Sequence, residues 1–241
     1  TYTGAFNTLD GLSRTKGKSL KDPEDGMNLY RTIRTSGPGL WDQESIAVGW
    51  LKTGEIWATP YFSGNVLALR GDEGLLLVDT GAVGATSKLQ SELKKFGRGA
   101  KVTTVINTHW HSDQTGGNEV FAKGGAKIIS HAKAAQRMAV DQYVPWEDRY
   151  IKARAKGAVP TEVFYLGKKE LKFGGETIEY GYLQQPHTDG DIYVHLRDSN
   201  VLVVGDAVSP QLDPLICWYE GGWVGGRVDS QAKILAMGNA E

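Results

Sequence analysis

Two histidines and an aspartate lie within five residues of one another, directly after a run of apolar and β-branched residues. The segment reads His109-Trp110-His111-Ser112-Asp113, and the run before it covers residues 102–106. Side chains alternate between the two faces of a strand, so a His-x-His pair that continues a strand places both rings on one side. Imidazoles and carboxylates are common zinc ligands in proteins. The segment therefore predicts a metal site at the end of a strand.

The same segment resembles the His-x-His-x-Asp-His signature of the metallo-β-lactamase-fold hydrolases. Three further segments are similar to that family, in the same order along the chain: an apolar strand that ends at Asp79, a segment that carries His187, and a strand that ends at Gly205-Asp206. The resemblance covers residues 55–225. It implies an α/β fold, namely an αββα sandwich in which two sheets pack face to face under outer helices.

Two departures from the family pattern affect the expected metal content. Gln114 stands where the family usually has a histidine, and a neutral amide is a poor zinc ligand. No histidine follows His195, so the last ligand of the family is absent from this sequence. The fold prediction leaves open whether the last strand and helix of the sandwich are missing.

The resemblance implies one well-formed zinc site, made by His109, His111 and His187 with a fourth place for water. Asp113 and Asp206 are expected around a second position that is weak or empty. Iron and manganese remain alternatives to zinc. A site of three histidines with an open position is sufficient to lower the pKa of bound water to about 7. Asp113 is the expected catalytic residue, which would orient or deprotonate that water.

Further residues are expected around these ligands. Asp79 and Gln114 are assigned to the surroundings of the site, with Asp79 steadying the ligand loop; the alternative for Asp79 is a plain turn cap. Three aromatic residues on a glycine-rich stretch, Trp218, Tyr219 and Trp223, are expected to line a pocket for an apolar or ring-containing substrate. The alternative is that they fill the core beneath this loop.

Three other residues near the motifs are assigned structural roles. His131 is the first residue of an expected helix and is interpreted as a structural residue. His195 lies within an expected strand and is not counted among the ligands. Trp110, between the two motif histidines, is expected to point away from the metal and to pack.

These residues predict a metal-dependent hydrolase. It would use zinc-activated water on a carbonyl ester, lactone, thioester or β-lactam-type bond. The alternative is a degenerate metal-binding pseudo-enzyme or a truncated fragment without hydrolytic activity, because Gln114 and the absent final histidine leave the second position incomplete. The fold alone does not choose among substrates.

The composition and charge of the chain limit the classes of partner that we expect it to bind. The formal net charge of −1 over 241 residues makes a nucleic-acid partner unlikely, since such binders normally carry a basic face. No run of 18 apolar residues is present, so no membrane span is expected. A small-molecule substrate is the expected partner, and a homo-oligomer stays open. Cys217 is the only cysteine and Thr1 the first residue, so the localisation stays unknown, with periplasmic, secreted and cytoplasmic all open.

The chain is divided into an N-terminal extension over residues 1–45 and a metallo-β-lactamase-like domain over residues 46–241. A short helix is expected at residues 23–32. Strands are expected at residues 55–60, 64–70, 75–79, 102–107, 127–130, 162–165, 171–173, 176–184, 192–197 and 201–204. Helices are expected at residues 86–96, 118–122, 131–143 and 230–237.

Overall fold

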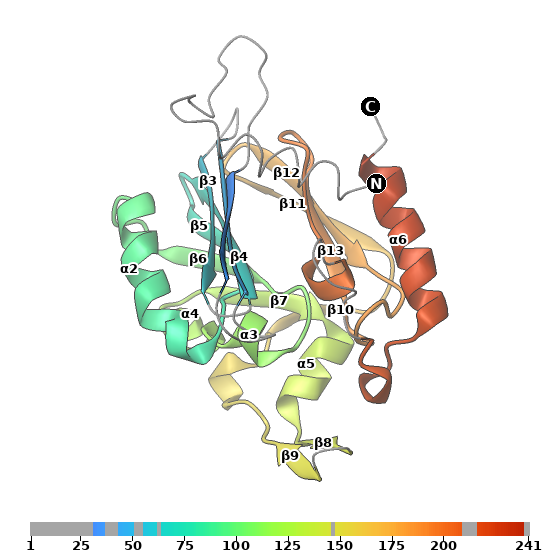
Figure 1. Cartoon of the computed structure of the whole chain (residues 1–241). Helices are drawn as coiled ribbons and strands as arrows, with labels where there is room; N and C mark the ends of the chain where they lie inside the picture. The colour runs from blue at the N-terminus through green and yellow to red at the C-terminus, as the bar shows by residue number, and fades with distance from the viewer. Residues whose placement is uncertain are drawn as a thin grey trace.

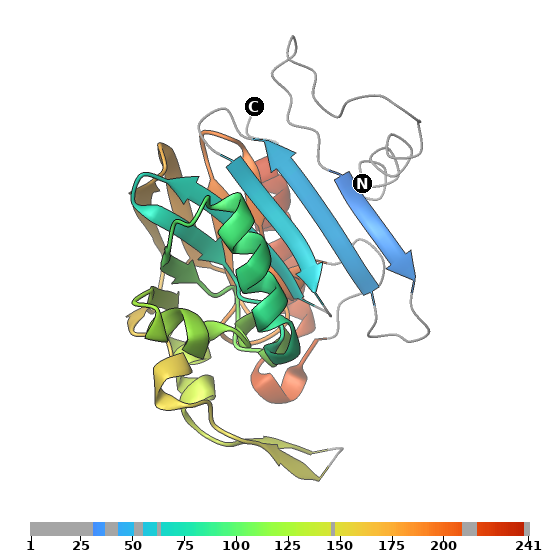
Figure 2. The same ribbon diagram turned by 90° about the vertical axis from the view of Figure 1, so that its left-hand side faces the viewer.

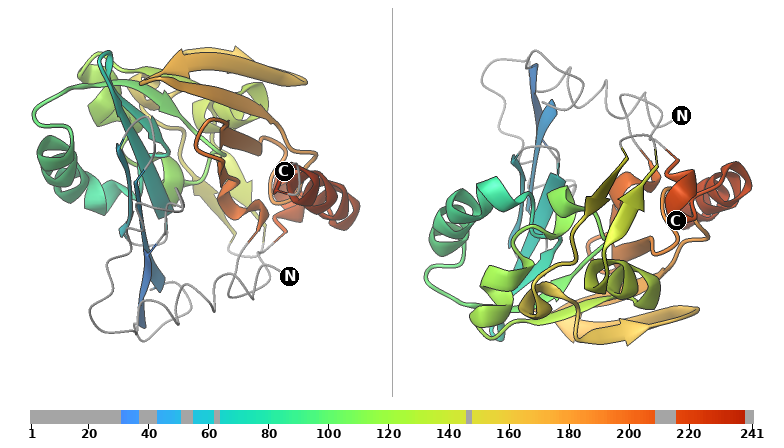
Figure 3. Two further views of the ribbon diagram at one scale, coloured as in Figure 1. Left: turned by 90° about the horizontal axis from the view of Figure 1, so that it is seen from above. Right: turned by 90° about the horizontal axis from the view of Figure 1, so that it is seen from below.

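A computed structural model describes residues 31–36, 43–50, 55–61, 64–145, 148–208 and 216–238. Within these residues two β-sheets face each other and helices cover both outer sides (Figure 1). Helix α2 (Thr86–Phe96) lies on one outer side and α6 (Val224–Gly238) on the other, as the view from above shows (Figure 3). This is the αββα sandwich that the sequence predicted.

The larger sheet has eight strands in the order β1-β2-β3-β4-β5-β6-β7-β10. The first five pair antiparallel, whereas β5, β6, β7 and β10 run parallel (Figure 2). The strands are β1 (Arg31–Ser36), β2 (Gln43–Trp50), β3 (Glu55–Tyr61), β4 (Gly64–Gly71), β5 (Gly74–Val78), β6 (Val102–Ile106), β7 (Lys127–His131) and β10 (Glu162–Phe164).

The smaller sheet has four antiparallel strands in the order β11-β12-β13-β14. They are β11 (Lys168–Phe173), β12 (Glu176–Tyr182), β13 (Ile192–Leu196) and β14 (Val201–Val203). Strands β8 (Gln142–Val144) and β9 (Arg149–Ile151) pair separately from both sheets. The remaining helices are α3 (Ser112–Thr115), α4 (Asn118–Lys123) and α5 (Ala132–Ala139), with 3₁₀ turns η1 (Val83–Ala85), η2 (Lys156–Ala158), η3 (Gly205–Ala207) and η4 (Trp218–Glu220).

Strands β4 and β5 are buried on both faces, which explains why their sequences are almost continuously apolar. Leu76 and Val78 point into the space between the sheets, where they meet Ile178 and Val194 of the smaller sheet. The alternate side chains of the same strands face outward and are covered by Leu89 and Leu93 of α2 among others. The i, i+4 spacing of these leucines gives α2 its apolar face.

The parallel strands bring the ends of separate segments to one edge. Asp79 directly follows β5, and residues 107–111 directly follow β6. In open α/β sheets the crevice outside the carboxyl ends of parallel strands is the usual place for a site. The fold therefore gathers the predicted site segments before any side chain is considered.

Several predicted bounds were wrong. Helix α5 ends at Ala139 and not at residue 143, because β8 begins at Gln142. Helix α6 begins at Val224, six residues before the predicted start. The sequence contains Gly225 and Gly226 there, which disfavour a helix by propensity. Packing overrides this preference, because an added Cβ on Gly226 would lie 2.1 Å from the carbonyl oxygen of Gln184.

The predicted N-terminal extension is only partly described. Strands β1 and β2 lie within it or cross its boundary, and they extend the larger sheet beyond β3. Of the helix predicted at residues 23–32, the last two residues belong to β1 and the others lie outside the described residues. The division at residue 45 stays a prediction. None of the described helices has the length and apolar character needed to cross a membrane.

Candidate metal centre

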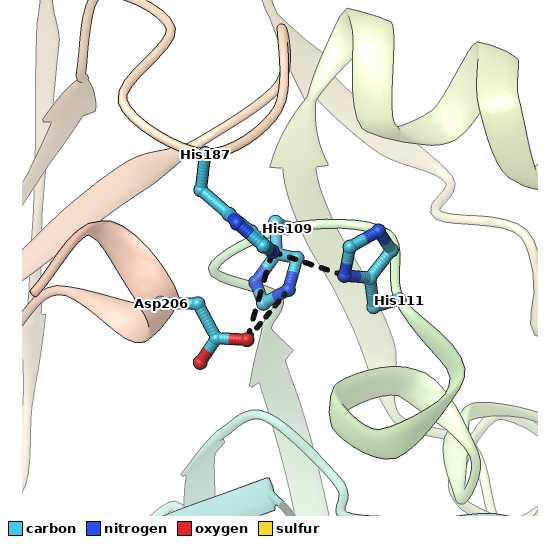
Figure 4. A group of neighbouring side chains, drawn as sticks. All are labelled: His109, His111, His187 and Asp206. Carbon is cyan, nitrogen blue, oxygen red and sulfur yellow. Dashed lines mark hydrogen bonds and ion pairs between the residues drawn. The ribbon is translucent and has the colours of Figure 1, made fainter. Parts of the chain in front are cut away.

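Four side chains meet at the edge where the two sheets face each other: His109, His111, His187 and Asp206 (Figure 4). The nitrogen and oxygen atoms that they offer all lie within 4.8 Å of one another. The larger sheet supplies two of them, from the loop between β6 and α3. The smaller sheet supplies the other two, one from the loop between β12 and β13 and one from η3 after β14.

The two motif histidines do not continue a strand, so the predicted reason for their convergence was wrong. Strand β6 ends at Ile106, and His111 immediately precedes α3. The loop between them turns both rings toward the same point. Trp110 between them is buried, as predicted for a packing residue, and its ring lies against α5 residues.

The distances show which atom each histidine presents. His187 Nε2 lies 3.1 Å from His111 Nδ1. Asp206 Oδ2 lies 3.5 Å from His109 Nε2 and 3.7 Å from His187 Nε2. His109 Nε2 is buried and has no hydrogen-bond partner in the described structure. Three imidazole nitrogens and a carboxylate oxygen form a donor set that suits a zinc ion.

The cluster is electrostatically coupled. Burial lowers the pKa of His109, but the carboxylates of Asp206, Asp191 and Asp79 together outweigh burial and raise that pKa to about 10. Burial raises the pKa of Asp206, but His109, His187 and His111 together hold it well below its usual range. The imidazoles and the carboxylate therefore attract one another across the two sheets.

Asp113 and Gln114 lie beside this group. Asp113 is half-buried in the first turn of α3 and is not one of the four clustered residues. Burial, followed by the charge of Asp206, raises its pKa. The buried Gln114 amide donates from Nε2 to Asp206 Oδ1 at 3.4 Å. Gln114, which stands where the family usually has a histidine, thus contacts the carboxylate of Asp206 directly.

Asp79 contacts the ligand loop through Thr108. Its two carboxylate oxygens accept bonds from the Thr108 backbone N–H at 2.8 Å and from the Thr108 hydroxyl at 2.6 Å. Thr108 Oγ1 also lies 3.1 Å from His109 Nδ1. Because the single hydroxyl hydrogen points at Asp79, His109 Nδ1 must be the donor in the second contact. In the neutral ring, the form that binds a cation, this arrangement leaves the lone pair of His109 on Nε2, inside the cluster.

We expect Asp79→Asn to weaken zinc binding by about 10- to 100-fold, the usual cost of losing a partner of a metal ligand. The amide N–H would face the Thr108 hydroxyl and turn its hydrogen toward His109 Nδ1. The ring hydrogen of His109 would then move to Nε2. Chelator competition at pH 8 measures the affinity, because burial raises the pKa of Asp79 to about 7. Asp141→Asn, on the surface beside Lys152, is the matched control; equal affinities for both variants would contradict the prediction.

The aromatic stretch is placed next to the cluster by backbone bonds. Cys217 N donates to the carbonyl of His187 at 3.0 Å, and Trp223 N donates to the carbonyl of Gln185 at 3.1 Å. Trp218 is 68 % exposed and Trp223 50 %, so neither fills the core beneath the loop. Substrate contact by Trp218, Tyr219 and Trp223 stays a prediction.

Sequence reasoning missed Glu220. It is the last residue of η4 and is buried, and its carboxylate contacts both His111 and Trp110. The only sequence signal for Glu220 was that an acidic residue lies within an aromatic and glycine-rich stretch.

Sequence reasoning also missed the ion pair between Arg137 of α5 and Asp189, which joins two nitrogens to two oxygens at 2.7 and 2.9 Å.

His131 and His195 are not part of the cluster. His195 on β13 contacts Asn200 at 3.4 Å. His131 caps α5: its Nδ1 accepts from the Lys133 backbone N–H at 3.3 Å, and its Nε2 donates to the Tyr165 carbonyl at 2.8 Å. Its ring stacks on Tyr182 with centroids 4.4 Å apart. These contacts require a neutral ring with its hydrogen on Nε2.

We expect His131 to make the fold less stable in mild acid. Burial lowers its pKa, Lys133 adds to this, and the Tyr165 carbonyl and the carboxylates of Asp189 and Asp191 only partly oppose it. A histidine whose pKa is lowered on folding contributes full stability above its unfolded pKa of about 6.5 and loses it as the pH falls through the folded value.

The comparison is with His131→Asn, which retains a side chain suited to capping but does not titrate. Between pH 8 and pH 5.5 the free energy of unfolding of the natural protein should fall by about 1 kcal/mol more than that of the variant, the usual value of a helix cap. Urea titrations at both pH values measure this. An equal fall in the free energy of unfolding of the two proteins between pH 8 and pH 5.5 would contradict the prediction.

The sequence matches the metallo-β-lactamase superfamily over residues 59–234, and the chain belongs to this superfamily. It is 25 % identical over 157 residues to the 2,4-dinitroanisole O-demethylase subunit alpha of Nocardioides sp. (strain JS1661), covering 64 % of this chain and 44 % of that protein. It is 31 % identical over 152 residues to the metallo-β-lactamase type 2 of Bacillus cereus, covering 60 % of this chain and 53 % of that protein. The chain spans about half the length of these relatives.

Solved structures support the fold. The metallo-β-lactamase IND-7 superposes with a TM-score of 0.57 at 20 % identity, covering 86 % of each chain. At this identity the likeness concerns the fold and not the substrate. The superfamily membership and the clustered histidines together indicate a metal-binding protein of a mostly hydrolytic family.

Proposed function

We propose that this protein is a metal-dependent hydrolase that uses one well-formed zinc site. The proposal depends chiefly on one observation: His109 Nε2, His111 Nδ1 and His187 Nε2 converge beside the Asp206 carboxylate, and His109 Nε2 is buried without a hydrogen bond. A divalent ion in this position supplies a Lewis acid that polarises a carbonyl and lowers the pKa of water to about 7. Iron or manganese would use the same nitrogen ligands.

The second metal position is proposed to be weak or empty. Asp206 already faces the histidines, and its other oxygen accepts a bond from the Gln114 amide. Asp113 would be the second strong ligand, yet it does not join the cluster. A position with one engaged carboxylate and a neutral amide is a poor match for a divalent cation.

Asp113 is proposed to act on the reacting water. Its carboxylate is half-buried and lies close enough to His109, His111 and Asp206 for their charges to alter its pKa. From the first turn of α3, the Asp113 carboxylate would accept a hydrogen bond from the reacting water and take up the proton that this water loses. The charges of the histidine cluster would stabilise negative charge that develops on the substrate oxygen.

The substrate class is proposed to be a small molecule with an ester, lactone, thioester or β-lactam-type bond. The names of the relatives point to different substrates, since one is a dinitroanisole O-demethylase subunit and another a β-lactamase. The exposed rings of Trp218 and Trp223, on the loop that is hydrogen-bonded to the His187 segment, favour an apolar or ring-containing group beside the reacting bond.

A substrate panel tests this proposal. The zinc-loaded protein is assayed against ester, lactone, thioester and β-lactam substrates, with and without chelator, beside His111→Ala. Turnover that disappears with chelator and is restored by zinc is the expected result. Turnover that persists in chelator and in His111→Ala would overturn metal catalysis.

A degenerate metal-binding protein is the second candidate, because Gln114 replaces a family histidine and contacts Asp206. The variant Gln114→His separates the two. A gain in metal content together with hydrolysis seen only in the variant would establish that the natural chain is degenerate. Hydrolysis by the natural chain would exclude that alternative.

A further inference from the structure

Glu220 is a buried acidic residue that none of the family motifs includes. Glu220 is only 1 % exposed, although it lies in the short turn η4 between the exposed residues Trp218 and Trp223. Backbone bonds fix its position: Glu220 N donates to the Cys217 carbonyl at 2.9 Å, and the Glu220 carbonyl accepts from Asp189 N at 2.9 Å. Burying a carboxylate is costly unless hydrogen bonds compensate it.

Two residues at the centre of the metal motif compensate one of the two carboxylate oxygens of Glu220. One oxygen, Glu220 Oε2, lies 2.5 Å from His111 Nε2 and accepts from Trp110 Nε1 at 3.1 Å. The carboxylate therefore contacts the ring nitrogen of His111 that does not face His187. Since His111 Nδ1 lies 3.1 Å from His187 Nε2, the two nitrogens of the His111 ring face different partners.

This contact determines which nitrogen of His111 can bind a cation. An ionised carboxylate only accepts hydrogen bonds, so His111 Nε2 carries the hydrogen. In a neutral imidazole the lone pair then belongs to Nδ1, the atom inside the cluster. The opposite assignment would place a hydrogen on Nδ1 and remove His111 from the ligand set.

We propose that Glu220 is a positioning residue that holds His111 in the tautomer and ring orientation required for metal binding. Pairs of a carboxylate and a metal-binding histidine of this kind fix the ring and make the ligand nitrogen more basic. The inference rests on the proposed metal site but not on hydrolysis. Loss of activity alone would therefore not test it.

The first test is made on the natural protein without metal. Nitrogen-15 chemical shifts of the histidine rings distinguish protonated from unprotonated ring nitrogens. His111 should show a hydrogen on Nε2 and a lone pair on Nδ1 at pH 8. A hydrogen on Nδ1 would overturn the proposal without any variant being made.

The second test compares two replacements of Glu220. Glu220→Gln keeps an oxygen that can accept from His111, whereas Glu220→Met has no acceptor. We expect Glu220→Met to lose the single tautomer and to bind zinc about 10- to 100-fold more weakly in chelator competition. Glu220→Gln should retain the tautomer and lie between this variant and the natural protein. If Glu220→Met does not fold, the nitrogen-15 shifts of His111 in Glu220→Gln decide: a hydrogen on Nε2 supports the proposal, and a hydrogen on Nδ1 overturns it.

Two further variants serve as controls. Trp110→Phe removes the other donor to the same oxygen but leaves the His111 contact, so the tautomer and the zinc affinity should stay close to the natural values. Glu176→Met makes the same replacement at a buried carboxylate of β12, outside the cluster. A fall in affinity in both controls equal to that of Glu220→Met would indicate general loosening of the fold and would overturn the positioning role. Normal zinc affinity in every variant would overturn it as well.

Discussion

Replacing His109 by alanine is expected to reduce zinc content from about one equivalent to near zero. Loss of a partner outside the coordination sphere already weakens binding by about 10- to 100-fold, so loss of a ligand should exceed that range. His109 Nε2 is buried inside the cluster without a hydrogen bond and lies 3.5 Å from Asp206 Oδ2. Metal analysis after zinc loading and dialysis measures the effect.

His195→Ala is the matched control, because His195 lies on β13 outside the cluster. It should retain the full zinc content. Equal zinc contents for the two variants would place the metal elsewhere in the protein. If the natural protein itself takes up no zinc, iron or manganese, the metal proposal fails.

Gly222→Ala is expected to weaken both the stability of the protein and its zinc binding, although it adds only one methyl group between Trp218 and Trp223. A Cβ at this position would lie 2.2 Å from the carbonyl oxygen of His187, so the loop and the ligand segment could not keep their present distance. We expect the free energy of unfolding to fall by at least about 1–3 kcal/mol, the usual cost of overpacking. Zinc binding should weaken at the same time, because both segments move.

The control for this change is Gly84→Ala in η1, where an added Cβ meets nothing within 4 Å. Urea unfolding and chelator competition on both variants provide the comparison. A Gly222→Ala protein with unchanged stability and unchanged zinc affinity would show that the contact between the loop and the His187 segment is loose.

The αββα fold could be predicted because the motifs and their order resemble those of a known family. Strands β4 and β5 and helix α2 were placed closely, since burial on two faces or on one helical face leaves a clear pattern. Helix α6 was predicted too short, because glycines at its start are tolerated only through a close contact with Gln184. Such a contact cannot be read from a single sequence.

The metal ligands were predicted as a set by resemblance, and the structure brings four of the five together. The geometric reason given for the His-x-His pair was wrong, since the pair lies in a loop and not on a strand. Asp113 was expected among the ligands and lies beside them instead. Glu220 was missed because its partners, His111 and Trp110, are more than a hundred residues away, a separation at which spacing carries no signal.

The origin of the four clustered side chains has a consequence for how this protein unfolds. Two come from the sheet that contains β6 and two from the sheet that contains β13, so a bound ion would tie the two halves of the sandwich together at one edge. A ligand that binds only the folded chain adds about 2.7 kcal/mol of stability at a free concentration one hundred times its dissociation constant. Zinc supply would then set the resistance of the chain to denaturation and proteolysis, so the amount of intact protein would follow the metal status of its surroundings.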